Sequence, residues 1–240
     1  MAGRVTFPAG TVAIVPARFA STRFPGKPLA DISGVPMVIR VMRGIAGSVD
    51  RAVVATDDKR IAEAVEGAGF QAVMTGDALS GTERVFMAWN QLGRPGKTVI
   101  NVQGDEPMVT GHWLKPLTLE PPGGDQVLTL ARRVPSARAA SPGSVKVVVA
   151  GNGEALYFSR YPVPHGSDQV LEHIGIYAFS PLSLSRCVSC GTTELSETER
   201  LEQLAWMESG IRLKVMVGDF PGIGVDTPED LEKAVVHFKQ

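Results

Sequence analysis

Three cationic side chains lie close together in a loop near the N-terminus. Arg18, Arg23 and Lys27 follow the apolar run 11–17, which is typical of a buried parallel strand. In an α/β sheet, the loop at the carboxyl end of a central strand is a common place for phosphate-bearing ligands to bind. The loop therefore predicts a polyphosphate site, and we favour this over the alternative that the cations form a solvated surface loop.

Two familiar phosphate-binding loops do not fit this segment. A Walker loop requires Gly-Lys followed by Ser or Thr as a helix begins, but Gly26-Lys27 is followed by Pro28. A Rossmann fingerprint requires Gly-x-Gly-x-x-Gly at a strand-to-helix turn, and the first predicted strand does not lead to one. We therefore expect charged side chains, more than backbone amides, to bind the phosphates.

Two acids that are distant in the sequence are candidate Mg²⁺ ligands. Asp105 follows the apolar run 97–102, and Asp226 lies in the glycine-rich turn 222–226. A carboxylate just beyond a buried parallel strand lies at the ligand-bearing edge of the sheet, although a Gly-Asp pair is also common in simple turns. Mg²⁺ takes one or two carboxylates and completes its octahedron with phosphate oxygens and water. The pair therefore predicts metal-assisted chemistry on a nucleoside triphosphate.

The elements that must position these residues alternate in the first half of the chain. Such alternation predicts a parallel sheet with right-handed crossovers. The predicted strands cover 11–17, 51–56, 70–74 and 97–102, and the predicted helices cover 36–45, 61–68 and 80–92. We expect Ser80 to cap the last of these helices, with Glu83 completing a capping box.

The pattern changes after residue 107, and a Pro- and Gly-rich break follows at 119–125. A hairpin turn at 151–153 predicts antiparallel pairing in this part of the chain. Further strands are predicted at 127–131, 145–150, 154–158, 171–179 and 212–217, and further helices at 196–208 and from Pro228 onward. We expect this part to fold onto the same sheet, so that the chain forms a single α/β domain.

Composition narrows the class of protein. The 240 residues are 44% hydrophobic and 20% charged, with a net charge of −1, which is ordinary for a globular chain and argues against a nucleic-acid or membrane partner. The N-terminus lacks the long apolar segment of a signal peptide, so we expect a cytoplasmic protein. Cys187 and Cys190 form a lone Cys-x-x-Cys without zinc-binding neighbours, and we interpret them as two reduced thiols on a helix with no assigned function.

Several motifs together resemble a known family. Residues 16–29, with the pattern Pro-Ala-Arg-x-x-Ser-x-Arg-x-Pro-Gly-Lys-Pro-Leu, resemble the opening motif of the 3-deoxy-manno-octulosonate (KDO) cytidylyltransferases, also called CMP-KDO synthetases. Similar family blocks follow in order at 80–84, 101–107, 145–148, 155–160, 173–177, 201–204 and 224–231. These blocks extend over nearly the whole chain.

The resemblance implies a fold and an activity. The fold would be a mixed, mainly parallel sheet flanked by helices, of the nucleotide-diphospho-sugar transferase type, with an antiparallel acceptor-side and dimerisation subregion. Within one domain, the nucleotide-binding part would cover 11–110, the acceptor-side part 125–215, and the metal-site turn and last helix 222–240. The activity would be Mg²⁺-dependent transfer of CMP from CTP to the acidic sugar KDO with release of pyrophosphate, by a homodimer that serves lipopolysaccharide synthesis.

The resemblance also implies roles for individual residues. The catalytic residues would be Arg18, Lys27, Asp105 and Asp226, of which the two acids bind Mg²⁺. The nucleotide would be bound by Ala17, Arg18, Ser21, Arg23, Lys27, Ser80, Arg84 and Gln103, and the acceptor by Arg160, His173, Tyr177, Glu202 and Gln203. Without the resemblance, His173 would be interpreted as a satisfied core histidine, and Glu202 and Gln203 as solvated helix surface.

The sequence departs from the family pattern mainly on the acceptor side. Residues 76–79 lack the usual histidine, Glu172 replaces a basic residue, Ser196 replaces an acid, and Ala205 replaces an arginine. An unmatched charge in such a site changes which ligand is favoured. The alternatives to KDO are therefore an amino-substituted relative of KDO or a small phosphonate or carboxylate. A nucleotide-binding regulator without catalysis is a further alternative, which the two intact acids disfavour.

Overall fold

The computed structural model describes residues 10–20, 24–141 and 143–239. The chain divides into two compact units: unit 1 consists of Met1–Leu119 and Pro221–Gln240, and unit 2 consists of Glu120–Phe220. The last segment of the chain therefore returns to the unit in which the chain begins.

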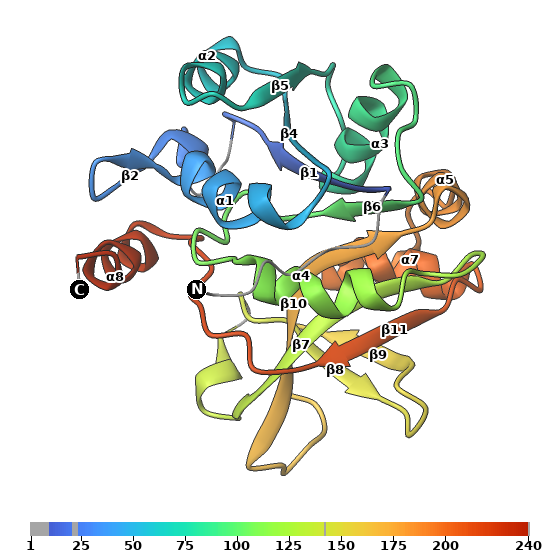
Figure 1. Cartoon of the computed structure of the whole chain (residues 1–240). Coiled ribbons are helices and arrows are strands. Elements are labelled where there is room, and N and C mark those ends of the chain that lie inside the picture. Colours follow the sequence, from blue (N-terminus) through green and yellow to red (C-terminus); the bar gives the residue numbers. More distant parts are fainter. Residues whose placement is uncertain (1–9, 21–23, 142, 240) are drawn as a thin grey trace. The chain divides into compact units, whose positions relative to one another are not determined.

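Unit 1 is built on a parallel sheet. Its strands are β1 (Thr11–Ala17), β4 (Arg51–Thr56), β5 (Gln71–Met74) and β6 (Thr98–Asn101), and β1 pairs in parallel with both β4 and β6 while β5 pairs with β4 (Figure 1). In β1 the side chains of Ala13, Ile14 and Val15 are completely buried, as expected for a central strand that is covered on both faces. The parallel sheet predicted from the alternating pattern is confirmed.

The helices of unit 1 connect these strands. They are α1 (Met37–Ile45), α2 (Lys59–Gly67), α3 (Gly81–Gln91), α4 (Gly111–Leu119) and α8 (Pro228–His237), with short helices η1 (Lys27–Leu29) and η2 (Ala46–Ser48) and a small hairpin of β2 (Asp31–Ile32) and β3 (Val35–Pro36). In the sheet, β4 and β5 lie on one side of β1 and β6 lies on the other. The connections to β4 and β5 therefore run in the opposite direction across the sheet from the connection to β6, and right-handed crossovers place α1 and α2 on one face and α3 on the other. The sequence did not predict α4, since Pro116 lies inside it and proline normally disfavours a helix interior.

Unit 2 contains the antiparallel pairing that the hairpin signal predicted. The long strands β7 (Val127–Pro135) and β10 (Gln169–Phe179) pair antiparallel, and β11 (Leu213–Val217) pairs in parallel with β7. The strands β8 (Lys146–Val149) and β9 (Ala155–Ser159) form the predicted hairpin, and β8 meets β10 where Glu172 lies opposite Lys146. A short helix η3 (Arg138–Ala140) follows β7.

One prediction about the helices of unit 2 is wrong. The predicted single helix 196–208 is two helices, α6 (Glu194–Glu199) and α7 (Glu202–Glu208), preceded by α5 (Pro181–Ser189). The chain breaks at Arg200, which has a left-handed φ of 53°. The side chain of Arg160 donates to the carbonyl oxygens of Glu199 (2.7 Å) and Arg200 (3.1 Å), so a tertiary contact satisfies the end of α6.

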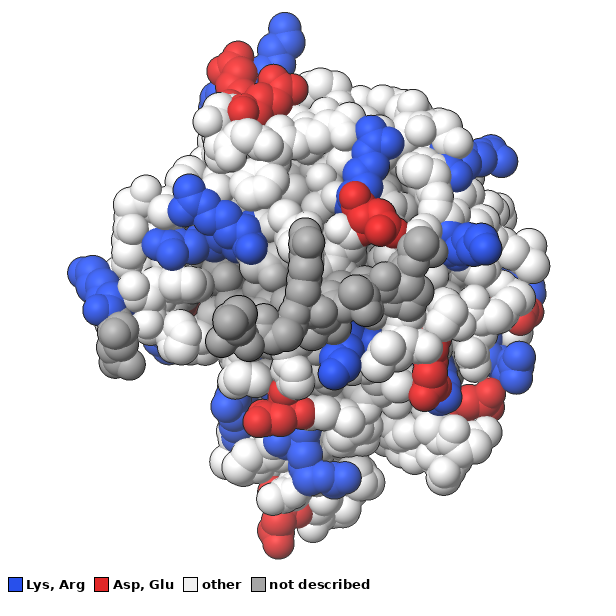
Figure 2. All heavy atoms as spheres, viewed as in Figure 1, with Lys and Arg blue, Asp and Glu red and all other residues white. Residues whose placement is uncertain are grey.

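The predicted fold class, a mixed and mainly parallel sheet flanked by helices, is confirmed. Figure 2 shows one face of the molecule, on which Lys and Arg side chains and Asp and Glu side chains lie in small groups separated by uncharged surface.

Candidate active site

The N-terminal basic loop is closed at its base by a backbone hydrogen bond. The N–H of Gly26 donates to the carbonyl oxygen of Phe19 (3.0 Å). Gly26 has a φ of +73°, and a Cβ at this position would meet the Phe19 ring at 3.1 Å, so glycine suits both the conformation and the space. This closure places Lys27 at the start of η1. Ser21 and Arg23, two of the predicted nucleotide-binding residues, lie outside the described residues.

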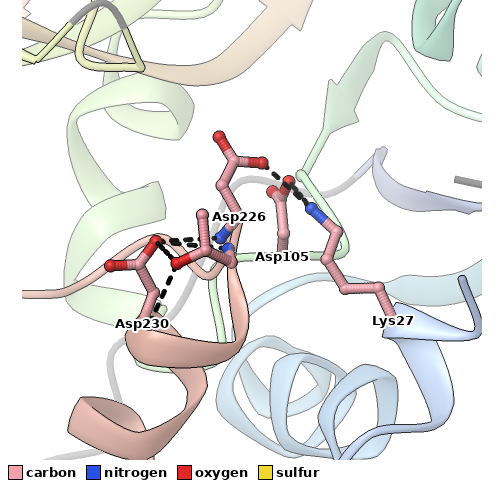
Figure 3. A network of polar contacts seen from close by, with 5 residues as sticks. Lys27, Asp105, Asp226 and Asp230 are labelled. Carbon is pink, nitrogen blue, oxygen red and sulfur yellow. Dashed lines mark hydrogen bonds and ion pairs between the residues drawn. The ribbon is translucent and has the colours of Figure 1, made fainter. Parts of the chain in front are cut away.

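Lys27 lies between the two predicted metal-binding acids. Its Nζ is 2.7 Å from Oδ2 of Asp105 and 3.2 Å from Oδ1 of Asp226 (Figure 3). Burial by itself lowers the pKa of Lys27, but the charges and hydrogen bonds of Asp105 and Asp226 outweigh it, so the pKa is raised above its ordinary value. Lys27 is therefore a fixed positive charge at neutral pH.

Backbone contacts keep the two acid-bearing segments adjacent. The N–H of Val225 donates to the carbonyl oxygen of Asp105 (2.9 Å). Directly after Asp226, Thr227 caps α8 and forms a capping box with Asp230. A Cβ on Gly104 would lie only 2.9 Å from the carbonyl oxygen of Pro16, so the turn that carries Asp105 approaches β1 as closely as only glycine allows.

The donor set fits a magnesium ion. Among the described residues, no group of three or more His, Cys, Asp or Glu side chains could hold a metal ion, and Asp105 and Asp226 offer two carboxylates. Mg²⁺ characteristically takes only one or two carboxylates and obtains its other ligands from phosphate and water. The ammonium of Lys27, within 3.2 Å of both carboxylates, shows that a cation suits the space between them.

A cavity of about 260 Å³ in unit 1 brings most of the predicted nucleotide and metal residues together. The predicted residues that line it are Ala17, Arg18, Lys27, Ser80, Arg84, Gln103, Asp105 and Asp226, and the remaining lining residues are Pro16, Pro28, Ala78, Leu79, Gly81 and Gly104. The cavity thus combines cations and carboxylates with an uncharged wall. Such a lining suits a ligand that has a polyphosphate and a less polar part.

The uncharged wall of the cavity is formed by the residues that lead into α3 and by the first residue of that helix. Ser80 caps this helix as predicted, because its Oγ accepts the N–H of Glu83 (3.2 Å). The predicted capping box does not form, because the Glu83 carboxylate accepts the N–H of Leu79 in place of that of Ser80. Arg84 is only 4% exposed although it lines the cavity, and its Nη2 is 2.6 Å from Oδ2 of Asp57. The guanidinium of Arg84 is therefore already paired with a carboxylate of the protein.

In unit 2, two of the predicted acceptor residues lie in an aromatic cluster. The ring of His173 packs against Phe158 and Tyr177, with centroid distances of 4.9 and 5.5 Å, and its Nε2 lies 2.9 Å from Oγ1 of Thr129. Burial lowers the pKa of His173 to about 3, so this ring is neutral at physiological pH. Burial, followed by the charge of Glu202, raises the pKa of Tyr177 well above its ordinary value.

The remaining acceptor residues lie on neighbouring elements of unit 2. Glu202 and Gln203 begin α7, and Gln203 is 3% exposed, so it is not the solvated helix surface that the residues alone suggested. Arg160 follows β9, where its side chain contacts the end of α6 and its backbone N–H donates to the Glu199 carboxylate (2.8 Å). Glu199 was not among the predicted site residues. It lies two residues before the family block 201–204, and this position could have drawn attention to it.

Two departures from the family pattern have internal partners. Glu172 accepts from Nε of Arg132 (2.7 Å) and from Oγ of Ser144 (2.6 Å), so it is not the unmatched charge that the sequence suggested. Ser196 completes a capping box with Thr193 at the start of α6. Glu172 has this partner because Arg132 lies opposite it on the paired strand β7, a tertiary contact that the local sequence does not reveal.

Asp57 was not among the predicted site residues. Its neighbour Asp58 caps α2, whereas Asp57 pairs with Arg84. Asp57 follows β4 directly, and Asp105 follows β6 after residues 102–104. The rule that drew attention to Asp105, an acid beyond a parallel strand, applies equally to Asp57.

The fold and this cavity define a class of protein. A mainly parallel sheet with a cationic loop after its first strand, and a pair of acids at the same cavity, is the architecture of a nucleotide-diphospho-sugar transferase-like nucleotidyltransferase.

Comparisons with known proteins identify the family. The model of the cytidylyltransferase family matches residues 12–214. A 3-deoxy-manno-octulosonate cytidylyltransferase of Porphyromonas gingivalis is 44% identical over 245 residues, which covers 95% of this chain and 96% of the relative. An enzyme of the same name from Anaeromyxobacter sp. (strain K) is 42% identical over 228 residues, covering 92% and 94%. The chain belongs to the 3-deoxy-manno-octulosonate cytidylyltransferase family.

A solved structure agrees with this assignment. The structure of CMP:2-keto-3-deoxy-manno-octonic acid synthetase complexed with CTP has a TM-score of 0.87 to this chain at 38% identity, and the match covers 97% of this chain and 99% of the other. Across the parts of the chain that the structure describes, no helix has the length and apolar character needed to cross a membrane.

Proposed function

We propose that this chain is an Mg²⁺-dependent enzyme that transfers CMP from CTP to KDO and releases pyrophosphate. The observation that supports this most directly is the cavity of unit 1, where Lys27, Asp105 and Asp226 are in contact beside Arg18 and Gln103. Family membership and relatives that carry the name of this reaction support the choice of CTP and KDO.

In the proposed reaction, the C2 hydroxyl oxygen of KDO attacks the α-phosphorus of CTP. A bond forms between this oxygen and the α-phosphorus, the bond to the oxygen that bridges the α- and β-phosphorus breaks, and the hydroxyl proton passes to solvent. Lys27 and Arg18 line the cavity, and their ammonium and guanidinium groups would offset charge on the phosphates. Asp105 and Asp226 would bind Mg²⁺, which supplies further charge neutralisation at the phosphates.

Turnover measurements test this proposal. The wild-type protein is incubated with CTP, Mg²⁺ and a panel of acceptors (KDO, an amino-substituted KDO, and small phosphonates and carboxylates), and pyrophosphate release is followed. We expect release with KDO. Release with another acceptor alone would replace KDO as the acceptor, and tight CTP binding without release for any acceptor would favour a non-catalytic regulator.

A pair of matched variants tests the metal site. Asp226→Asn removes a carboxylate that contacts Lys27, while Asp230→Asn makes the same change four residues later in the cap of α8, where an amide oxygen also accepts hydrogen bonds. We expect Asp226→Asn to lower kcat by about 100-fold or more, the range for loss of one charge-stabilising contact in a transition state. Equal activity of Asp226→Asn and wild type would remove Asp226 from the metal site.

We also propose that the enzyme is a cytoplasmic homodimer. Exposed apolar side chains in unit 2 support dimer formation, since Leu156 is 60% and Tyr161 80% exposed. The cytoplasm is the compartment that supplies CTP. Light scattering after size-exclusion chromatography should give twice the chain mass, and a mass equal to one chain would contradict the dimer.

A further inference from the structure

The segment 76–80 forms one wall of the cavity in unit 1. Ala78, Leu79 and Ser80 line the cavity, and the segment contains no cation and a single acid, Asp77. A wall without cations is suited to the uncharged nucleoside rather than to the phosphates. Leu79 is 95% exposed, so packing does not hold the segment in place, and other contacts must do so.

Hydrogen bonds fix both ends of this segment. At its end, Ser80 caps α3 and the N–H of Leu79 donates to the Glu83 carboxylate. At its start, Nη1 of Arg84 donates to Oγ1 of Thr75 (2.6 Å) and to the carbonyl oxygen of Gly76 (3.4 Å). One side chain of α3 thus holds the beginning of the loop that leads into α3.

Asp57 orients the Arg84 side chain from a third element. Oδ2 of Asp57 is 2.6 Å from Nη2 of Arg84, and the two side chains are 26% and 5% exposed. Asp57 itself does not line the cavity. The ion pair offsets the charge of Arg84 and directs the other terminal nitrogen of its guanidinium toward Thr75 and Gly76.

We propose that Asp57 is a positioning residue for nucleotide binding, which acts through Arg84 to hold the wall segment 76–80 against the nucleoside. This inference rests on the proposed function, because it assumes that CTP binds in this cavity. Arg84 then serves the site through the loop that it holds and not as a ligand of the phosphates.

The two roles of Arg84 predict different dependences on phosphate number. If the Asp57–Arg84 pair positions the wall, weakening it lowers affinity for CTP, CDP and CMP by the same factor, because all three contain the same nucleoside. If Arg84 is a phosphate ligand, the effect of the variants depends on the number of phosphates, because each added phosphate increases the charge that Arg84 would meet.

The test uses conservative variants of the full-length protein. Asp57→Asn keeps an acceptor for Arg84 and removes the charge, and Thr75→Val removes the other contact without changing any charge. Asp125→Asn is the matched control, because it removes the charge from an Arg–Asp pair with Arg186 in unit 2. Dissociation constants for CTP, CDP and CMP are measured by calorimetry, with melting temperatures and kcat at saturating CTP.

We expect Asp57→Asn to weaken the binding of all three nucleotides by about fivefold, the difference between a charged and a neutral hydrogen bond. Thr75→Val should act in the same direction, Asp125→Asn should have no effect, and kcat at saturating CTP should stay within twofold of wild type. Unchanged nucleotide binding in both variants, or an effect of Thr75→Val that changes with phosphate number, overturns the inference. If wild type releases pyrophosphate but the variants bind normally, only this inference fails; if wild type binds no CTP, the proposed function fails first.

Discussion

Replacing Lys27 with methionine tests how much the lysine ammonium stabilises the two neighbouring carboxylates of the cavity. Lys27 is 14% exposed, and its Nζ contacts Asp105 at 2.7 Å and Asp226 at 3.2 Å, with the acids 30% and 36% exposed. At an effective dielectric constant near 20, a pair of unit charges at 4 Å interacts by about 4 kcal/mol. Solvent at the two partly exposed acids reduces this, so we expect a loss of about 2 kcal/mol, between the values for surface and buried pairs.

The assay is thermal unfolding with EDTA or with excess Mg²⁺. A loss of about 2 kcal/mol lowers the Tm of a chain of this size by about 4–8 °C. Without their ammonium, Asp105 and Asp226 form a stronger site for a divalent cation, so Mg²⁺ should restore at least half of the lost Tm in Lys27→Met while it shifts the wild-type Tm much less. In the same variant, kcat/KM for CTP should fall by about 100-fold or more.

A surface lysine supplies the control. Lys214 contacts Glu120 at 2.9 Å, but the two side chains are 34% and 62% exposed, so Lys214→Met should change the Tm by no more than about 2 °C, with or without Mg²⁺. The reasoning is refuted if Lys27→Met keeps the wild-type Tm in EDTA, or if its Tm falls and Mg²⁺ does not raise it more than in wild type.

Three further predictions concern stability. Gly44→Ala should destabilise by about 3 kcal/mol or more in chemical denaturation, because its Cβ would lie 2.0 Å from a backbone carbonyl oxygen before α4, whereas Gly67→Ala, a helical position with open space, should be neutral or stabilising. Arg132→Met should cost about 3 kcal/mol by breaking the ion pair of the largely buried Glu172, and the double variant with Glu172→Met should recover much of this loss. His173 has a folded pKa of about 3, below its unfolded value, so stability should fall as pH drops from 6.5 to 5 by up to about 1.4 kcal/mol per pH unit, and His173→Gln should remove this part of the slope.

The strands of unit 1 could be predicted closely because each has an apolar centre, with polar residues only at its ends. The first strand was predicted at 11–17 and is Thr11–Ala17, and the helix predicted at 61–68 is Lys59–Gly67. Local signals failed where a tertiary contact decides the conformation. At Arg200 the helix breaks because the Arg160 side chain satisfies its last carbonyl oxygens, and a helical pattern alone does not reveal a contact across 39 residues.

The candidate site shows the same division. Asp105 was found from its place after a strand, and Asp226 from its place in a glycine-rich turn. The partners of Lys27 were not predicted, because they lie 78 and 199 residues away and a lysine in a basic loop resembles a phosphate ligand. The acceptor roles of Arg160, His173, Tyr177, Glu202 and Gln203 stay predictions.

The charges around Lys27 affect whether a metal ion and a nucleotide bind in the cavity separately or together. One ammonium between two carboxylates leaves a single net negative charge, so a divalent cation that joined them alone would reverse the sign of the cluster. A triphosphate brings enough negative charge to offset both cations, and Lys27 has a third N–H that can donate to a phosphate oxygen while the other two face the acids. We therefore expect the metal and the triphosphate to bind together. The same count explains why Mg²⁺ alone should stabilise Lys27→Met much more than wild type.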